Sequence, residues 1–130
     1  MPKPVLLDTN AVIHFVQALD LSKFSIVART LNNNQCYVPA EIIVEAVYIM
    51  DGKLQNDRQT TAAKLKDFIA LQDGLVSESN AVTFGLNLYA SSSLDIVDCL
   101  LAGYAKVNGR PVLTFDSSLK KQLAEQAYIP

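Results

Sequence analysis

The sequence has 130 residues, half of them hydrophobic and 18% charged, with a mean hydropathy of +0.19. This size and composition exclude an intrinsically disordered chain and indicate a single domain spanning residues 1–130. Eleven basic and thirteen acidic side chains give a net charge of −2, which excludes nucleic-acid binding through a global positive field.

No apolar run reaches the roughly 18 residues of a membrane-spanning helix. The start, residues 1–4, is followed too soon by an acid to resemble a signal peptide. Cys36 and Cys99 lie far apart and without metal-type spacing, which favours free thiols in a reducing compartment. We therefore expect a cytoplasmic protein without a membrane partner.

The first half of the chain alternates short apolar runs with stretches of helical period. Residues 5–7 are wholly apolar and stop at Asp8, as in a strand that is buried on both faces. The capping types that follow predict a helix to residue 19, and a second helix is expected over 21–31. A second short strand, 36–38, ends at a proline and leads into an apolar helix to residue 50.

The second half continues this alternation. Helices are predicted over 57–71, 80–90 and 94–107, followed by a buried-type strand over 112–115 and a helix from 118 to about 126. Minor strands are expected at 74–76 and 128–129. Strands and helices that alternate over one domain predict an α/β fold with a central parallel sheet and helices on both faces.

Two of the predicted strands end in an aspartate, Asp8 and Asp116. The ends of parallel strands meet at one edge of the sheet, where such folds bind ligands. If the two strands are neighbours at the point where strand order reverses, their carboxylates face one crevice. Each aspartate could instead only cap the helix that follows it.

Capping does not explain the acids inside helices. Glu45 lies in an apolar helical stretch, and Asp95 and Asp98 are three residues apart on one helical face. A charged carboxylate in apolar surroundings is costly unless it is paired or binds a metal, and no lysine or arginine lies within a turn of Asp98. An all-oxygen donor set suits Mg²⁺ or Mn²⁺ and would support hydrolysis of a phosphodiester.

Basic residues outside this acidic set are candidates for phosphate contacts, whereas Asp57 and Arg58 are expected on a solvated helix face. A phosphotransfer domain of the receiver type is an alternative, but the 112–115 strand lacks the expected lysine. A binding module that needs no metal also remains open. The candidate phosphate contacts are Lys64, Lys66, Lys106, Arg110, Lys120 and Lys121.

Four motifs, in this order along the chain, resemble those of the PIN domain family. The resemblance extends from residue 5 to about residue 123 and includes the spacing of the motifs. It implies a Rossmann-like fold, an acidic Mg²⁺ or Mn²⁺ site and ribonuclease activity, often as the VapC-like toxin of a toxin–antitoxin pair, and frequently a homodimer. The motifs are Leu7-Asp8-Thr9-Asn10, Val38-Pro39-Ala40-Glu41-Ile42-Ile43-Val44-Glu45, Asp95-Ile96-Val97-Asp98-Cys99-Leu100-Leu101-Ala102 and Leu113-Thr114-Phe115-Asp116.

By this resemblance the metal-holding acids are Asp8, Glu45, Asp98 and Asp116. Asn10 and Thr114 match polar residues that orient the acids, and Asp95 matches an additional acid one turn before the third. Cys99 stands where the family usually has alanine, and no basic residue near the site is evident from the sequence. The implied partners are an RNA substrate, an antitoxin protein and a second copy of the chain. The implied alternative is a PIN-fold binding module without strong nuclease activity.

Overall fold

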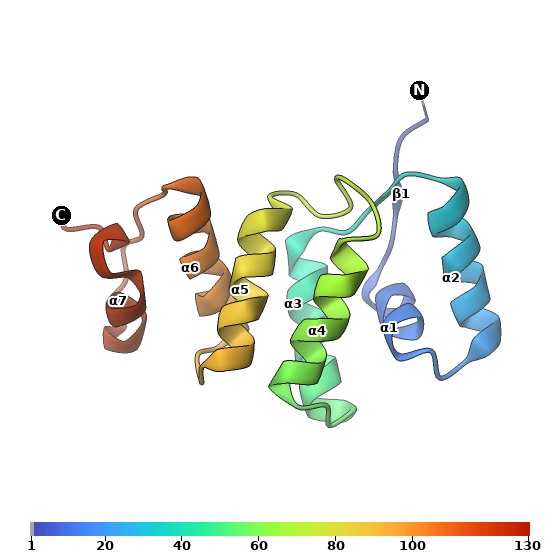
Figure 1. The fold of residues 1–130 in the computed structure, drawn as a ribbon, viewed down its shortest axis with the longest axis horizontal. Helices are drawn as coiled ribbons and strands as arrows, with labels where there is room; N and C mark the ends of the chain where they lie inside the picture. The colour runs from blue at the N-terminus through green and yellow to red at the C-terminus, as the bar shows by residue number, and fades with distance from the viewer. Residues whose placement is uncertain (1) are drawn as a thin grey trace.

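The computed structural model describes residues 2–130 and shows a mainly helical chain with one small parallel sheet (Figure 1). The first half contains β1 (Val5–Leu6), α1 (Thr9–Gln17), α2 (Leu21–Asn33), β2 (Cys36–Tyr37) and α3 (Ala40–Tyr48). The second half contains the π-helical turn η1 (Ile49–Lys53), α4 (Arg58–Ile69), α5 (Ser79–Ser91), α6 (Ile96–Asn108), α7 (Ser117–Leu123) and the 3₁₀ turn η2 (Ala124–Gln126).

Aspartates start many of these helices. The carboxylates of Asp8, Asp95 and Asp116 accept hydrogen bonds from backbone N–H groups in the first turns of α1, α6 and α7, at 2.9, 3.1 and 2.8 Å. Asp20 and Asp57 do the same for α2 and α4. Each cap satisfies an N–H that has no partner within its helix. The capping role expected as the alternative for Asp8 and Asp116 is therefore present.

The sheet is smaller than the sequence predicts. β1 and β2 pair in parallel, with Val5 opposite Cys36, and no further strand joins them in the described chain. The minor strand expected at 74–76 does not form. The segment makes one hydrogen bond next to β2, from Val38 N to the Leu75 carbonyl at 2.7 Å. The prediction of an α/β fold is confirmed, but a central sheet covered by helices on both faces is only partly present.

The predicted strand over 112–115 is wrong in its placement. Val112 forms an isolated parallel bridge to Ala127, while Leu113 and Phe115 are exposed. The physical reason is local packing, because Leu119 and Leu123 of α7 are fully buried in a small cluster against α6 that also includes Val112. The C-terminal segment is thereby held on α6, away from β1 (Figure 1).

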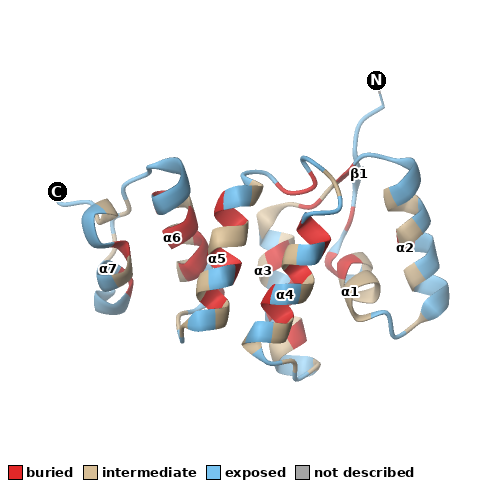
Figure 2. Ribbon diagram, viewed as in Figure 1, coloured by how far each residue is buried: buried red, intermediate tan, exposed pale blue. Residues whose placement is uncertain are grey.

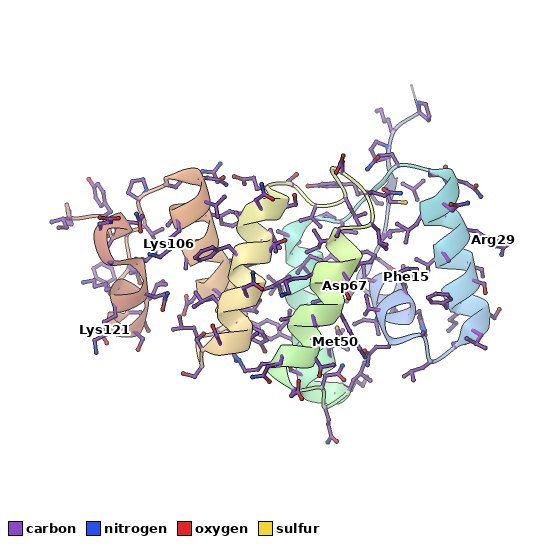
Figure 3. The ribbon with its side chains drawn as sticks, viewed as in Figure 1. Phe15, Arg29, Met50, Asp67, Lys106 and Lys121 are labelled. Carbon is purple, nitrogen blue, oxygen red and sulfur yellow. The ribbon has the colours of Figure 1, made fainter. Side chains whose placement is uncertain are left out.

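The main hydrophobic core lies among α1 and α3–α6, whose inward faces are buried (Figure 2). Phe15 of α1 stacks on Phe24 of α2 with ring centroids 5.0 Å apart and tilts against Phe68 of α4 (Figure 3). Cys36 and Cys99 are buried free thiols, as predicted. No single described helix is long and apolar enough to cross a membrane; α1 and α2 satisfy that test only together, across a bend of 109°.

α5 and α6 pack closely because glycines lie at their contact. A Cβ on Gly103 would lie 2.1 Å from the Ala81 carbonyl oxygen, and one on Gly85 would lie 2.9 Å from the Cys99 carbonyl oxygen. Both obstacles are backbone atoms, which cannot turn away as a flexible side chain can. This contact therefore determines where α6, and the acid it carries, lies.

We predict that Gly103→Ala destabilises the fold by about 3 kcal/mol, because the added methyl must push α5 and α6 apart. The free energy of unfolding in urea measures the loss. Gly52→Ala is the matched control, since a Cβ there meets nothing within 4 Å. Equal stability of the two variants would contradict the close α5–α6 contact.

Candidate active site

Asp8 lies directly after β1 and is exposed. One carboxylate oxygen caps α1, so the other is free for a ligand. Beside it is a shallow, mainly apolar hollow of about 230 Å³, lined by Leu6, Leu7, Asp8, Pro39 and Ile42. Asn10 is exposed one residue into α1.

Glu45 and Tyr48 continue from this hollow along α3. Glu45 is three residues after Ile42 and three before Tyr48, so it lies between them on the helix surface, and it is exposed. The Tyr48 hydroxyl donates to Asp95 Oδ1 at 2.8 Å. This hydrogen bond, followed by burial and the charges of Asp95 and Asp98, raises the pKa of Tyr48. Tyr48 thus joins α3 to the start of α6.

Asp98 is half-buried in the first turn of α6. Burial raises the pKa of its carboxyl, and the charges of Asp116 and Asp95 raise it further. Thr114 Oγ1 accepts from the backbone N–H of Asp116 at 3.1 Å, which orients the chain just before α7. Three of the predicted acids, Asp95, Asp98 and Asp116, therefore interact electrostatically at this end of α6.

We call Asp8, Glu45, Asp95, Asp98 and Asp116 the acidic row. Asp8 lies beside the hollow that Ile42 lines, and Asp95 is bonded to Tyr48 about 9 Å further along the α3 axis, with Glu45 between them on α3. Asp98 and Asp116 lie beyond α3, at the starts of α6 and α7. Oxygen donors of this kind are the ligands that Mg²⁺ and Mn²⁺ prefer. Nevertheless, no three His, Cys, Asp or Glu side chains among residues 2–130 lie close enough together to hold a metal ion. The acids are of the right type to bind these ions, but in this structure they lie too far apart to bind one ion together.

Arg58 is a basic residue near the row that sequence reasoning missed. Its guanidinium carbon lies 3.6 Å from the Tyr89 ring centroid, its Nε donates to the Tyr89 carbonyl at 2.8 Å, and its Nη2 donates to the Leu94 carbonyl. Leu94 directly precedes Asp95, so Arg58 holds the turn that leads into α6. The expectation of a solvated Arg58 is wrong. A signal was present, because arginine in the first turn opposes the helix dipole and so calls for a tertiary partner.

Asp51 belongs to the same network of side chains as Arg58, which it joins through Tyr89. Its carboxylate accepts hydrogen bonds from the hydroxyls of Thr61 and Tyr89. Burial and these contacts raise the pKa of Tyr89, against an opposing effect of Arg58. The network links η1, α4, α5 and the turn before α6. Asp51 lies in a π-helical turn, a local geometry that the helical pattern of the sequence does not reveal.

Most of the predicted phosphate-contacting cations have protein partners. Lys64 donates to Gln17, Lys66 to Asn87 and Lys106 to Gln126, while Arg110 forms an ion pair with Glu78 at 2.9 Å. Lys120 and Lys121 are exposed in the last turn of α7, at the same end of the molecule as Lys106 (Figure 3). These two remain the more available cations near Asp116.

Carboxylate oxygen donors on an α/β scaffold are the kind of site that a metal-dependent nuclease uses. A sequence model described as the PIN domain matches residues 5–122, and the chain therefore belongs to the PIN domain family. PIN domains are in general nucleases that act on nucleic acid and typically use divalent metal ions. Comparison with curated proteins and with solved structures gave no match.

We predict that Arg58→Ala costs about 2–4 kcal/mol of stability, because it leaves two part-buried carbonyls without a donor and removes the contact with Tyr89. Gln59→Ala is the matched control, since it removes a neighbouring α4 bond to an α5 carbonyl, at Ala90, but does not touch Leu94. Urea unfolding should show a loss below about 1 kcal/mol for the control. A similarly small loss for Arg58→Ala would contradict the network.

Asp98 should make stability depend on pH. Its folded-state pKa is raised, so the folded chain favours the protonated form, and stability falls as pH rises through that pKa. We predict that Asp98→Asn stabilises the fold at about pH 7, by up to about 1 kcal/mol, and gives no gain at about pH 3. Thermal unfolding at both pH values measures this.

Asp57→Asn provides the control of opposite sign. Hydrogen bonds from Thr60 lower the pKa of Asp57, so its charge favours folding, and the substitution should destabilise the chain at neutral pH. If Asp98→Asn is destabilising at neutral pH, the acids around it do not repel one another as the structure indicates.

Proposed function

We propose that the protein is an endoribonuclease that depends on Mg²⁺ or Mn²⁺, with Asp8, Glu45, Asp98 and Asp116 as the metal-holding acids. The observation that carries the proposal is the half-buried Asp98, whose pKa is raised by burial and by Asp116 and Asp95. The ion pair found among residues 2–130, between Arg110 and Glu78, involves none of the acidic row. Carboxylates that repel one another without a basic partner are suited to a cation.

Asp95, Asn10 and Thr114 have supporting roles in this proposal. Asp95 caps α6 and accepts from Tyr48, so it fixes the start of the helix that carries Asp98. Thr114 bonds to the Asp116 backbone. Asn10 lies two residues after Asp8, on the exposed surface of the first turn of α1. Each of these residues would adjust the position of an acid or a substrate phosphate.

The biological role that we propose is that of a cytoplasmic toxin in a type II toxin–antitoxin pair. Its support is the resemblance of the four motifs to VapC-like PIN domains. The exposed carboxylates of Asp8 and Glu45 and the apolar hollow beside Asp8 suit an antitoxin segment that combines a basic and an apolar side chain. A small neighbouring gene for a DNA-binding protein, whose product suppresses growth arrest, is the expected finding.

We predict that the purified chain cleaves RNA with Mn²⁺ or Mg²⁺ and loses cleavage in EDTA. Asp8→Asn and Asp98→Asn should each lower the cleavage rate by at least about 100-fold with the fold retained, because the acids act as a unit. Cleavage of a labelled RNA on denaturing gels measures the rate, and circular dichroism checks the fold.

Asp73→Asn is the control, since Asp73 is an exposed acid outside the acidic row. Undiminished cleavage by both site variants would overturn the assigned acids. If the wild-type chain binds RNA without cleaving it and calorimetry detects no Mn²⁺ binding, the chain is instead a PIN-fold binding module.

A further inference from the structure

Phe115 is an aromatic residue that the fold leaves in solvent. It is 91% exposed, more than any other large hydrophobic residue that the structure describes. The aromatic contacts found among residues 2–130 do not involve its ring. Burial of a phenylalanine ring is favourable, and packing within this chain does not provide it here.

The helix that follows Phe115 does not use the ring either. Asp116 caps α7, so Phe115 is the residue before the cap and Lys120 is the fourth residue of the helix. An apolar residue before the cap often packs against an apolar side chain at this fourth position. Because the fourth position is a lysine, the ring has no such partner and stays exposed. The usual structural role of an apolar residue at this place is therefore absent.

Two lysines of α7 lie close to the ring in the chain and are available to an anion. Lys120 and Lys121 are exposed, and within residues 2–130 neither side chain donates a hydrogen bond or forms an ion pair. Lys120 N bonds to the Asp116 carbonyl, so Lys120 follows Asp116 by one turn on the same face of α7. Figure 3 shows Lys121 on this helix, at the end of the molecule.

These neighbours indicate which class of partner the ring suits. Acidic, hydroxyl and cationic side chains follow Phe115, and residues 116–118 are all exposed. The centre of a protein–protein contact is usually apolar and poor in charge. Single-stranded nucleic acid has the complementary chemistry, because its bases stack on aromatic rings and its phosphates bind cationic side chains. The ring and the two lysines together therefore favour single-stranded RNA over a protein.

We propose that Phe115 is a stacking platform for one base of single-stranded RNA, with Lys120 and Lys121 binding the phosphates next to that base. The inference rests on the proposed function for its view of this RNA as the substrate. Phe115 is joined directly to Asp116, a member of the acidic row. A base held on the ring brings the adjoining phosphate to the Asp116 end of the row. Phe115 thus positions the substrate and takes no part in the chemical step.

The first test uses the absence of tryptophan from the sequence. Phe115→Trp keeps an aromatic face at this position and gives the chain a single tryptophan. The background carries Asp98→Asn, so the readout does not depend on cleavage. An unstructured oligoadenylate of about 12 nucleotides is the probe, a length within the range that single-strand sites bind. We expect a saturable loss of tryptophan emission as the base stacks on the indole.

The matched control is Leu19→Trp in the same background. Leu19 is 78% exposed and directly follows Ala18 at the end of α1, far from α7 along the longest axis (Figure 1). Its tryptophan emission should not change at the same RNA concentrations. Equal loss of emission in both variants would show RNA bound over the whole surface and overturn the proposal. Bound RNA, detected by anisotropy of a labelled probe, without loss of emission from position 115 would overturn it as well.

The second test separates stacking from a simple apolar contact. Phe115→Ala should weaken binding of the same RNA by about 10-fold or more, which is the effect of losing one stacked base. Phe115→Leu should weaken it nearly as much, because leucine is apolar but has no aromatic face. Leu21→Ala is the control, since it removes another apolar side chain that is 72% exposed, in α2. Full affinity of Phe115→Leu would overturn stacking and indicate an apolar surface for a protein.

The third test concerns the two lysines. Each phosphate contact to a single strand contributes about 0.7 to the slope of log affinity against log salt concentration. A chain with both Lys120→Gln and Lys121→Gln should therefore show a slope smaller by about 1.4. A chain with Lys3→Gln and Lys23→Gln undergoes the same change in charge at two other exposed lysines and should keep the slope. Equal slopes for the two double variants would overturn the assigned phosphate contacts.

Cleavage by the otherwise unchanged chain distinguishes this proposal from the nuclease proposal. Phe115→Ala should raise KM for RNA about 10-fold and leave kcat within about twofold, because stacking contributes equally to the ground state and the transition state. Wild-type cleavage with an unchanged KM in Phe115→Ala would overturn the platform and leave the nuclease proposal intact. An inactive wild type whose Phe115→Trp variant still loses emission with RNA would overturn the nuclease proposal and support the platform.

Discussion

The close approach of α5 and α6 is the contact on which the rest of the molecule depends. Gly85 and Gly103 allow backbone to meet backbone there, so α6 has one position relative to the core. That position places Asp98 at the start of α6, half-buried and near Asp95 and Asp116. It also provides the surface on which α7 forms its own small cluster. The glycine contact thus decides both where Asp98 lies and where the C-terminal segment packs.

The acidic row shows how a charge arrangement is built from local structural roles. Asp8, Asp95 and Asp116 each cap a helix with one oxygen, which fixes the carboxylate without neutralising it. Arg58 donates a hydrogen bond to the Leu94 carbonyl and so holds the turn that precedes Asp95. Because the Arg58 guanidinium donates to backbone carbonyls, it orders the turn before α6 without forming an ion pair with the acids. The residues that cap the helices are therefore the ones to which we assign the proposed function.

The sheet has only two strands, and the acids do not cluster, for the same reason. The segment that would complete the sheet is the one that carries Asp116, and α7 holds that segment on α6.

The sequence alone determined the local features: helices with their aspartate caps, free thiols, the absence of a spanning helix among the described residues, and membership of the PIN domain family. Periodicity and capping act over a few residues, so they can be read from the chain. Only the tertiary structure decided that residues 112–115 leave the sheet and that Arg58 contacts Tyr89 and Leu94. It also decided that no three acids among residues 2–130 come close enough together to hold a metal ion. These outcomes depend on contacts between residues far apart in the sequence, such as the packing of Leu119 and Leu123 on α6. Alternative contacts of this kind compete, and a local sequence pattern does not show which of them is more stable.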